Sequence, residues 1–150
     1  MSESATFMEQ IEPLFNSQPL AVLATSSDNS PYTSLVAFAA TDDLTRLIFA
    51  TMRTTRKYTN LSNNPNVSLL IDNRSNQAED FHDAIAVTVV GTVTEATEIE
   101  REQFLPLYLA RHPLLKAFVL DPSCTLLMVQ VKTYYLVSQF QSVMQLNMIS

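Results

Sequence analysis

Glycine and cysteine are almost missing from this sequence. Its 150 residues include one glycine, Gly91, and one cysteine, Cys124. The single glycine excludes a G-x-G-x-x-G dinucleotide loop and a Walker loop, because each needs several glycines close together. The single cysteine excludes an internal disulfide bond and a cysteine-rich metal cluster, and its place beside an apolar run predicts a core residue. A nucleotide-like cofactor would therefore need another kind of phosphate site.

Long apolar runs and an excess of positive charge are also absent. No run approaches the ~18 apolar residues of a membrane span, and the first ten residues lack the basic and apolar regions of a signal peptide. The formal net charge of −6 argues against nucleic acid as a main partner, because phosphate backbones need a broad cationic surface. We therefore expect a cytoplasmic protein with no nucleic-acid or membrane partner. With 47% apolar residues, residues 1–150 are expected to form a single domain.

The hydrophobic pattern predicts short strands separated by turns and short helices. Strands are predicted at 19–26, 31–41, 46–51, 66–72, 84–94, 126–131 and 134–138, and helices at 5–16, 54–63, 95–110 and 114–119. Gly91 inside a β-branched strand indicates a bulge or a close backbone approach. No alternating parallel pattern is present, so the fold class is α+β but mainly β, an antiparallel barrel of six or seven strands with short flanking helices.

One stretch concentrates positive charge. Between Leu44 and Ile71 there is no Asp or Glu, yet four of the nine cations lie there: Arg46, Arg53, Arg56 and Lys57. A buried strand, a hydroxyl-rich turn and a helix start follow one another here, with Thr54 or Thr55 as the N-cap. Free backbone N–H groups, hydroxyls and cations around one point suit a phosphate. A solvated basic helix face accounts for the charge pattern equally well.

The same stretch carries a resemblance to a known family. The run T-x-R-x-T-x-K, from Thr51 to Lys57, followed by NL, NNP and VSLL, resembles the core of the pyridoxamine-phosphate-oxidase-like FMN-binding split barrels. The resemblance extends from about residue 19 to about residue 140. It implies a split barrel that binds FMN in a homodimer, with each flavin in a groove between the subunits, and a redox function with an unassigned substrate.

The resemblance also assigns candidate cofactor-binding residues. The ribityl phosphate would be held by Thr51, Arg53, Thr55, Arg56 and Lys57. The polar edge of the ring would meet backbone groups of Ser34, Leu35 and Val36. Asn73 and Arg74 are further candidates, which the second subunit would supply. No catalytic residue and no metal site is predicted, since the flavin carries the redox chemistry itself.

The sequence also departs from the vitamin B6 enzyme of that family. That enzyme has a further C-terminal segment whose Trp, Arg and His residues hold the pyridoxyl substrate, whereas this chain has no Trp and ends LNMIS. Oxidation of pyridoxamine phosphate is therefore not expected. Three alternatives stay open: a haem-binding or haem-handling protein on the same barrel, a non-catalytic flavin sensor, and a deazaflavin-binding protein.

Other side chains have simpler structural interpretations. His82, in an Asp-Phe-His-Asp cluster, is expected in a solvated loop rather than at a metal, and His112 is expected to be structural at a helix end. These two histidines are also the obvious axial ligands if the ligand is haem. Tyr134, Tyr135 and Phe140 are candidates to border a planar ligand, although a core position is commoner for such residues. Met144 and Met148 are candidates to flank a cofactor, but packing across an interface is the simpler interpretation.

Overall fold

A computed structural model describes residues 3–139 and 142–149, so Phe140 lies outside the described residues. The elements follow one another in this order: α1 (Glu3–Ser17), β1 (Leu20–Ser27), β2 (Ser30–Ala40), β3 (Arg46–Met52), α2 (Arg56–Asn63), β4 (Asn66–Asp72), α3 (Asp80–Asp83), β5 (Ile85–Glu95), α4 (Glu98–Arg111), the 3₁₀ turn η1 (Pro113–Leu115), α5 (Lys116–Leu120), β6 (Cys124–Ser138) and β7 (Ser142–Asn147). Among the described residues, no helix is both long and apolar enough to cross a bilayer.

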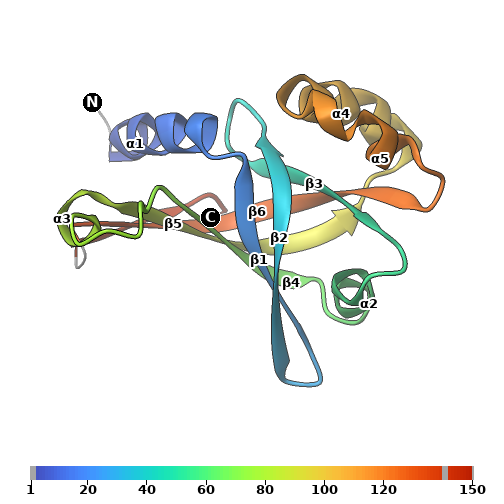
Figure 1. Cartoon of the computed structure of the whole chain (residues 1–150), viewed down its shortest axis with the longest axis horizontal. Coiled ribbons are helices and arrows are strands. Elements are labelled where there is room, and N and C mark those ends of the chain that lie inside the picture. The colour runs from blue at the N-terminus through green and yellow to red at the C-terminus, as the bar shows by residue number, and fades with distance from the viewer. Residues whose placement is uncertain (1–2, 140–141, 150) are drawn as a thin grey trace.

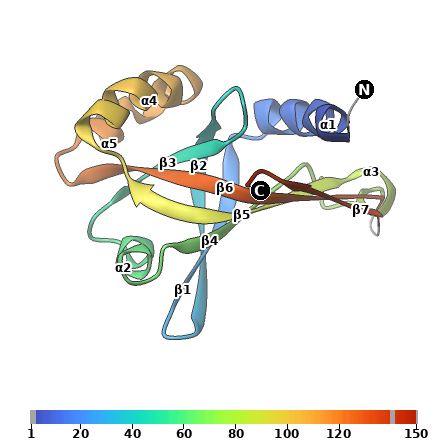
Figure 2. The ribbon, with the colours of Figure 1, turned by 180° about the vertical axis from the view of Figure 1, so that it is seen from behind.

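Six strands close into an antiparallel barrel, and a seventh extends it. The strand order is β3-β2-β1-β4-β5-β6-β7, and an additional β3–β6 pairing closes the ring. Strand β6 bridges the structure, since residues 124–130 pair with β3 and residues 133–138 pair with β7. The helices flank the barrel, with α1 and α4 near one end and α2 near the other (Figures 1 and 2). The predicted split barrel with six or seven strands and short helices is confirmed.

The barrel is split between β2 and β3. These strands pair only at residues 38–40 of β2, whereas β2 pairs with β1 over residues 30–37. The edge of β2 that faces away from β1 is therefore unpaired over this long segment. Beyond the split, β1 and β2 project as a hairpin whose tip is visible at the bottom of Figure 1. Asp28 and Asn29, with φ of 51° and 61°, form its two-residue turn, as the turn-forming residues there predicted.

Two apolar cores lie on opposite faces of the sheet. Inward-facing residues fill the barrel, and α1 closes one end with Phe7, Ile11, Leu14 and Phe15. A second cluster lies under α4 and α5, where Tyr108 packs near outward-facing strand residues. Because the barrel is filled by its own side chains, a flat cofactor has to bind outside it.

Gly91 marks a close backbone approach, as predicted. Pairing of β5 with β6 shifts register between Val90 and Gly91, and Lys132 is the extra residue on β6. A Cβ atom on Gly91 would lie 2.3 Å from the carbonyl oxygen of Gln130. No side chain fits there, so the bulge depends on glycine at this position.

The last two predicted strands, 126–131 and 134–138, are wrong as separate strands. Residues 126–131 and 134–138 were expected to be two paired strands, but they form one continuous strand, β6. The polar residues between the two segments lie at the bulge rather than in a turn. The partner of the second half of β6 is β7, and Met144 in β7 and Met148 just beyond it pack against the main core of the same chain.

Candidate functional site

The end of β3 and the start of α2 form a compact polar corner. Buried residues of β3 fix the strand between β2 and β6, and a turn then connects Met52 to Thr55 through a 3.3 Å hydrogen bond from the Thr55 N–H to the Met52 carbonyl. Thr55 is the N-cap of α2, and its hydroxyl accepts a hydrogen bond from the Tyr58 N–H. The sequence predicted Thr54 or Thr55 for this position, and Thr55 occupies it. We call Thr51, Thr55, Arg56 and Lys57 the β3–α2 corner.

Two hydroxyl groups of this corner are held in place. Thr51 is buried, and its Oγ1 lies 2.9 Å from the Oγ1 of Thr55. Both hydroxyls also lie within hydrogen-bond distance of the Met52 carbonyl oxygen, at 3.2 and 3.0 Å. The pair is therefore oriented before any ligand arrives, which reduces the entropy that a ligand must overcome.

The corner also carries donors that the protein leaves free. The backbone N–H groups of Arg56 and Lys57 begin α2, and neither has an acceptor among the described residues. The side chains of Arg56 and Lys57 form no ion pair in that part of the chain, and the guanidinium of Arg56 lies 5.8 Å from the centre of the Tyr32 ring. Helix α2 has no acid in its first turn. Free amides, a positive helix end and two uncommitted cations are the chemistry of an anion site.

Arg53 differs from the rest of the predicted phosphate-binding set. Its guanidinium donates to the Pro122 carbonyl at 3.1 Å and pairs with Glu95 at 3.4 Å. The Tyr58 hydroxyl donates to the other oxygen of Glu95 at 2.5 Å. This hydrogen bond lowers the pKa of the Glu95 carboxyl and raises the pKa of the Tyr58 phenol. The acid-free stretch between Leu44 and Ile71 thus has Glu95 beside it in the fold, and Arg53 is already paired with this carboxylate.

The predicted ring-binding segment lies on the free edge of β2. The Phe38 N–H donates to the Pro19 carbonyl on the side of β1, at 3.3 Å. Successive residues of a strand direct their backbone groups to opposite edges, so the N–H and C=O of Leu35 face away from β1 toward the split. Backbone groups of Ser34 and Val36 face β1 instead. Of the three predicted residues, Leu35 presents its backbone, and its side chain is 65% exposed.

Ser34 contributes a buried hydroxyl without a partner. Its Oγ atom is covered by protein and has no hydrogen-bond partner among the described residues. A buried hydroxyl in this state costs free energy until an acceptor or donor reaches it. Its side chain lies on the same face of β2 as the core residue Val36, so the hydroxyl is covered rather than open to a ligand at the free edge.

Asn73 and Arg74 do not join this site within one chain. They follow β4, whose seven residues separate them from α2 by about 20 Å at ~3.3 Å per residue. Arg74 pairs with Asp72 at 3.1 Å, and the Asn73 side chain accepts a hydrogen bond from the Ile85 N–H at 2.7 Å. Within one chain, Asn73 and Arg74 therefore lie away from the β3–α2 corner, and their predicted role remains a prediction.

The remaining candidate side chains divide into core and surface. His112 is buried with its Nε2 2.7 Å from the Phe38 carbonyl oxygen, as the structural interpretation predicted, whereas His82 is exposed on α3. Tyr134 is a core residue that donates to the Leu44 carbonyl, and Cys124 is buried as expected. In the described part of the chain, no group of three or more potential ligands could hold a metal ion.

Glu95 is the neighbour of the corner that sequence reasoning missed. It lies 42 residues beyond Arg53, and only the pairing of β5 with β6 and of β6 with β3 brings the two together. Nothing in the local sequence signals this contact. Tyr32 was also missed, because its place over Arg56 depends on how far the β1–β2 hairpin projects.

Several solved structures share this architecture. A heme binding protein from Mycobacterium smegmatis is 16% identical with a TM-score of 0.78, and the match covers 87% of this chain but 53% of that one. General Stress Protein 26 from Bacillus anthracis is 24% identical with a TM-score of 0.69, covering 93% and 98%. A FAD-binding protein from Mesorhizobium loti is 15% identical with a TM-score of 0.69, covering 86% and 90%. At these identities the likeness concerns the fold, and this chain spans about half the length of the mycobacterial protein.

The sequence itself gives a family assignment. No curated protein matches the chain significantly. The sequence profile described as pyridoxamine 5'-phosphate oxidase matches residues 7–138, which include the whole barrel and the β3–α2 corner. The chain therefore belongs to the pyridoxamine 5'-phosphate oxidase family.

Proposed function

We propose that this protein binds FMN, with the phosphate of the flavin at the β3–α2 corner. The observation that carries the proposal is the set of uncommitted donors there: the amides of Arg56 and Lys57, their side chains, and the preset hydroxyls of Thr51 and Thr55. Phosphate is the anion that such a helix start and cation pair suit best. Arg53 takes a supporting role, because it is paired with Glu95.

The flavin ring is proposed to lie along the free edge of β2. The backbone of Leu35 supplies a donor and an acceptor there. A flavin bound in this way supplies hydride or electron transfer, while the chain supplies binding and orientation. We assign the protein to the flavin-dependent oxidoreductases without naming a substrate.

A second copy of the chain is proposed to cover the ring. The groove is external because the barrel is filled by its own side chains, and the ring needs an apolar cover to exclude water. In such a homodimer Asn73 and Arg74 would approach the flavin of the partner. Size-exclusion chromatography with light scattering tests this part, and a monomer at micromolar concentration when saturated with FMN would overturn it.

Flavin titration tests the central proposal directly. FMN added to protein stripped of small molecules should lose fluorescence as it binds, and the double variant Arg56→Ala/Lys57→Ala should weaken binding by at least roughly a hundredfold, since each charge-assisted contact contributes about 1.5–3 kcal/mol. Lys116→Ala removes an exposed lysine from α5 and is the matched control, with unchanged affinity expected. Wild-type protein that neither copurifies with a flavin nor binds added FMN contradicts the proposal.

Turnover separates an enzyme from a flavin sensor or a deazaflavin protein. Bleaching of the bound flavin by NADH or NADPH, followed by reoxidation, supports an oxidoreductase. Tight binding without reduction supports a sensor. Mass spectrometry of the copurifying small molecule distinguishes FMN from a deazaflavin.

Haem is the second candidate, and two observations support it. A structural neighbour is described as a heme binding protein, and His82 is exposed on α3 beside the exposed Phe81. His112 is a poor axial ligand because its Nε2 already contacts the Phe38 carbonyl oxygen. Haem titration should give a Soret band that His82→Ala removes and His112→Ala retains. FMN binding without any Soret band eliminates this candidate.

A further inference from the structure

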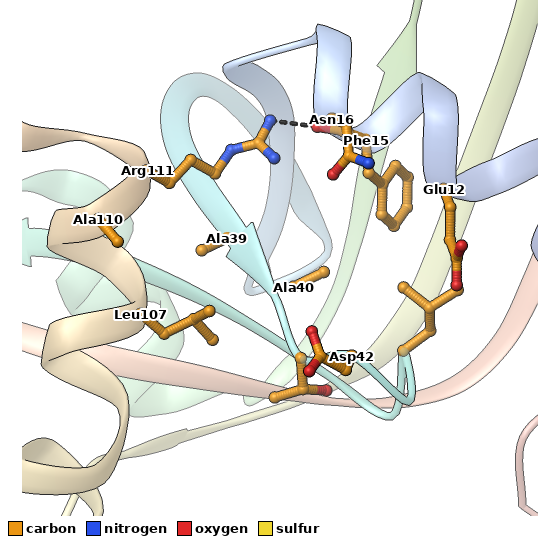
Figure 3. Close-up of a pocket in the computed structure, with 11 residues that line it drawn as sticks. Glu12, Phe15, Asn16, Ala39, Ala40, Asp42, Leu107, Ala110 and Arg111 are labelled. Carbon is orange, nitrogen blue, oxygen red and sulfur yellow. Dashed lines mark hydrogen bonds between the residues drawn. The ribbon is translucent and has the colours of Figure 1, made fainter.

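A second cleft lies at the end of the barrel away from α2. Helix α1, the turn between β2 and β3, and the C-terminal half of α4 surround a volume of about 500 Å³ (Figure 3). That volume is within the range of small-molecule sites. We call it the α1–α4 cleft. None of the ten predicted cofactor-binding residues lines it.

Arg111 forms one side of this cleft and has no carboxylate partner among the described residues. One of its amino groups donates to the carbonyls of Phe15 and Gln18 at the end of α1, and its guanidinium lies 4.9 Å from the centre of the Phe38 ring. Its Nε–H is buried and has no acceptor within that part of the chain. Burial lowers the pKa of this guanidinium, which remains a cation at neutral pH. One side of the cleft is therefore a half-buried positive charge that no acid among the described residues neutralises.

Two carboxylates lie across the cleft from this cation. Glu12 comes from α1 and Asp42 from the β2–β3 turn, and Figure 3 shows both on the side opposite Arg111. Both are exposed, and neither forms an ion pair with a described residue. Ala39, Ala40 and Leu107 form the apolar surface between the two charged sides. The cleft is thus positive at one side, apolar in the middle and negative at the other.

We infer that the α1–α4 cleft binds a small zwitterionic molecule. Its carboxylate pairs with Arg111, its ammonium group lies between Glu12 and Asp42, and its short apolar body contacts the two alanines. A simple anion would meet two carboxylates, and a simple cation would meet the arginine, so each is disfavoured by one side of the cleft. A molecule with both charges satisfies each side, and its carboxylate supplies the anionic partner that Arg111 lacks among the described residues.

The probe for this inference is 6-aminohexanoate, with hexanoate and hexylamine as single-charge controls. Amide chemical shifts in a titration of the full chain should change saturably with 6-aminohexanoate, and the changes should centre on residues 39–42 and 107–111. Affinity for either control should be at least tenfold weaker. Absence of saturable shifts, or equal affinity for hexanoate, overturns the inference.

Variants identify the two ends of the ligand. The double variant Glu12→Gln/Asp42→Asn should weaken 6-aminohexanoate binding about tenfold, because the contacts of the ammonium group are lost. Its affinity for hexanoate should stay equal or increase. Both positions are exposed, so folding should be retained. Asp28→Asn, at the tip of the β1–β2 hairpin, is the matched control and should leave affinity unchanged. If the double variant binds 6-aminohexanoate as tightly as the wild-type protein does, the assignment of the negative side is overturned. The FMN affinity of each variant, measured in parallel, should not change.

Discussion

The two ends of the barrel use basic side chains in opposite ways. At the β3–α2 corner, Arg56 and Lys57 form no ion pairs among the described residues, and Arg56 is exposed while Lys57 is half-buried. At the α1–α4 cleft, Arg111 is half-buried, bonded to two carbonyls of the chain and packed on Phe38. Arg111 contributes to the folded state through these neutral partners, whereas Arg56 and Lys57 contribute little to it. The contrast predicts that stability and cofactor affinity depend on different residues.

The largest expected effect is a difference in the free energy of unfolding between Arg111→Ala and Lys57→Ala. Arg111→Ala removes charge-assisted hydrogen bonds to the end of α1 and packing on Phe38, so it should lower the free energy of unfolding by about 2–3 kcal/mol. Lys57→Ala should change it by less than about 0.5 kcal/mol, since its side chain forms no ion pair with a described residue. Urea unfolding followed by circular dichroism measures both. Equal destabilisation by the two variants would show that the contrast between the two ends is wrong.

Added salt should weaken FMN binding at the β3–α2 corner but should not change the stabilisation that Arg111 provides. Exposed charges are screened over about 10 Å at 0.1 M salt and about 3 Å at 1 M, so the dissociation constant for FMN should rise several-fold between about 0.05 and 0.5 M NaCl. The stability difference between wild type and Arg111→Ala should stay the same, because its partners are neutral carbonyls at short range. Riboflavin, which lacks the phosphate, is the control ligand and should show little salt dependence.

The location of the corner was predictable because its signals are local. A buried strand, a run of hydroxyl residues and the N-cap at Thr55 follow one another within a few residues, and each has a short-range physical cause. The barrel was predictable for a similar reason, since its strands carry β-branched patterns bounded by turns. The family resemblance added FMN as the proposed cofactor, which no residue pattern alone specifies.

Features that depend on distant pairing were not predictable. The contact of Glu95 with Arg53 requires β3 and β5 to flank the same strand, β6. The continuity of β6 through Lys132 requires the missing side chain at Gly91, which lets the backbones approach at the bulge. The α1–α4 cleft joins residues about one hundred positions apart, such as Glu12 and Arg111, so no local pattern indicates it.

Substitution of Glu95 tests whether its ion pair keeps Arg53 away from a ligand bound at the β3–α2 corner. Glu95→Gln removes the ionic partner of Arg53, and Arg53 should then become available to the flavin phosphate. We expect FMN to bind two- to five-fold more tightly, because an exposed ion pair contributes only about 0–1 kcal/mol. Riboflavin affinity should not change. Tighter binding of both ligands would instead indicate a general structural effect.

Glu95→Gln should also change, by a small amount, how the free energy of unfolding depends on pH. The fold lowers the pKa of Glu95, mainly through the hydrogen bond from Tyr58, so its contribution is present above the unfolded pKa of about 4.3 and is lost as the pH falls through the folded value. Wild-type protein should therefore lose slightly more stability than Glu95→Gln between about pH 5 and pH 3, by less than about 0.5 kcal/mol for such an exposed group. Tyr58→Phe removes the principal cause of the shift and should reproduce most of this difference. Identical pH profiles in all three proteins would mean that the carboxylate makes no favourable contact in solution, and that Arg53 is as free as Lys57.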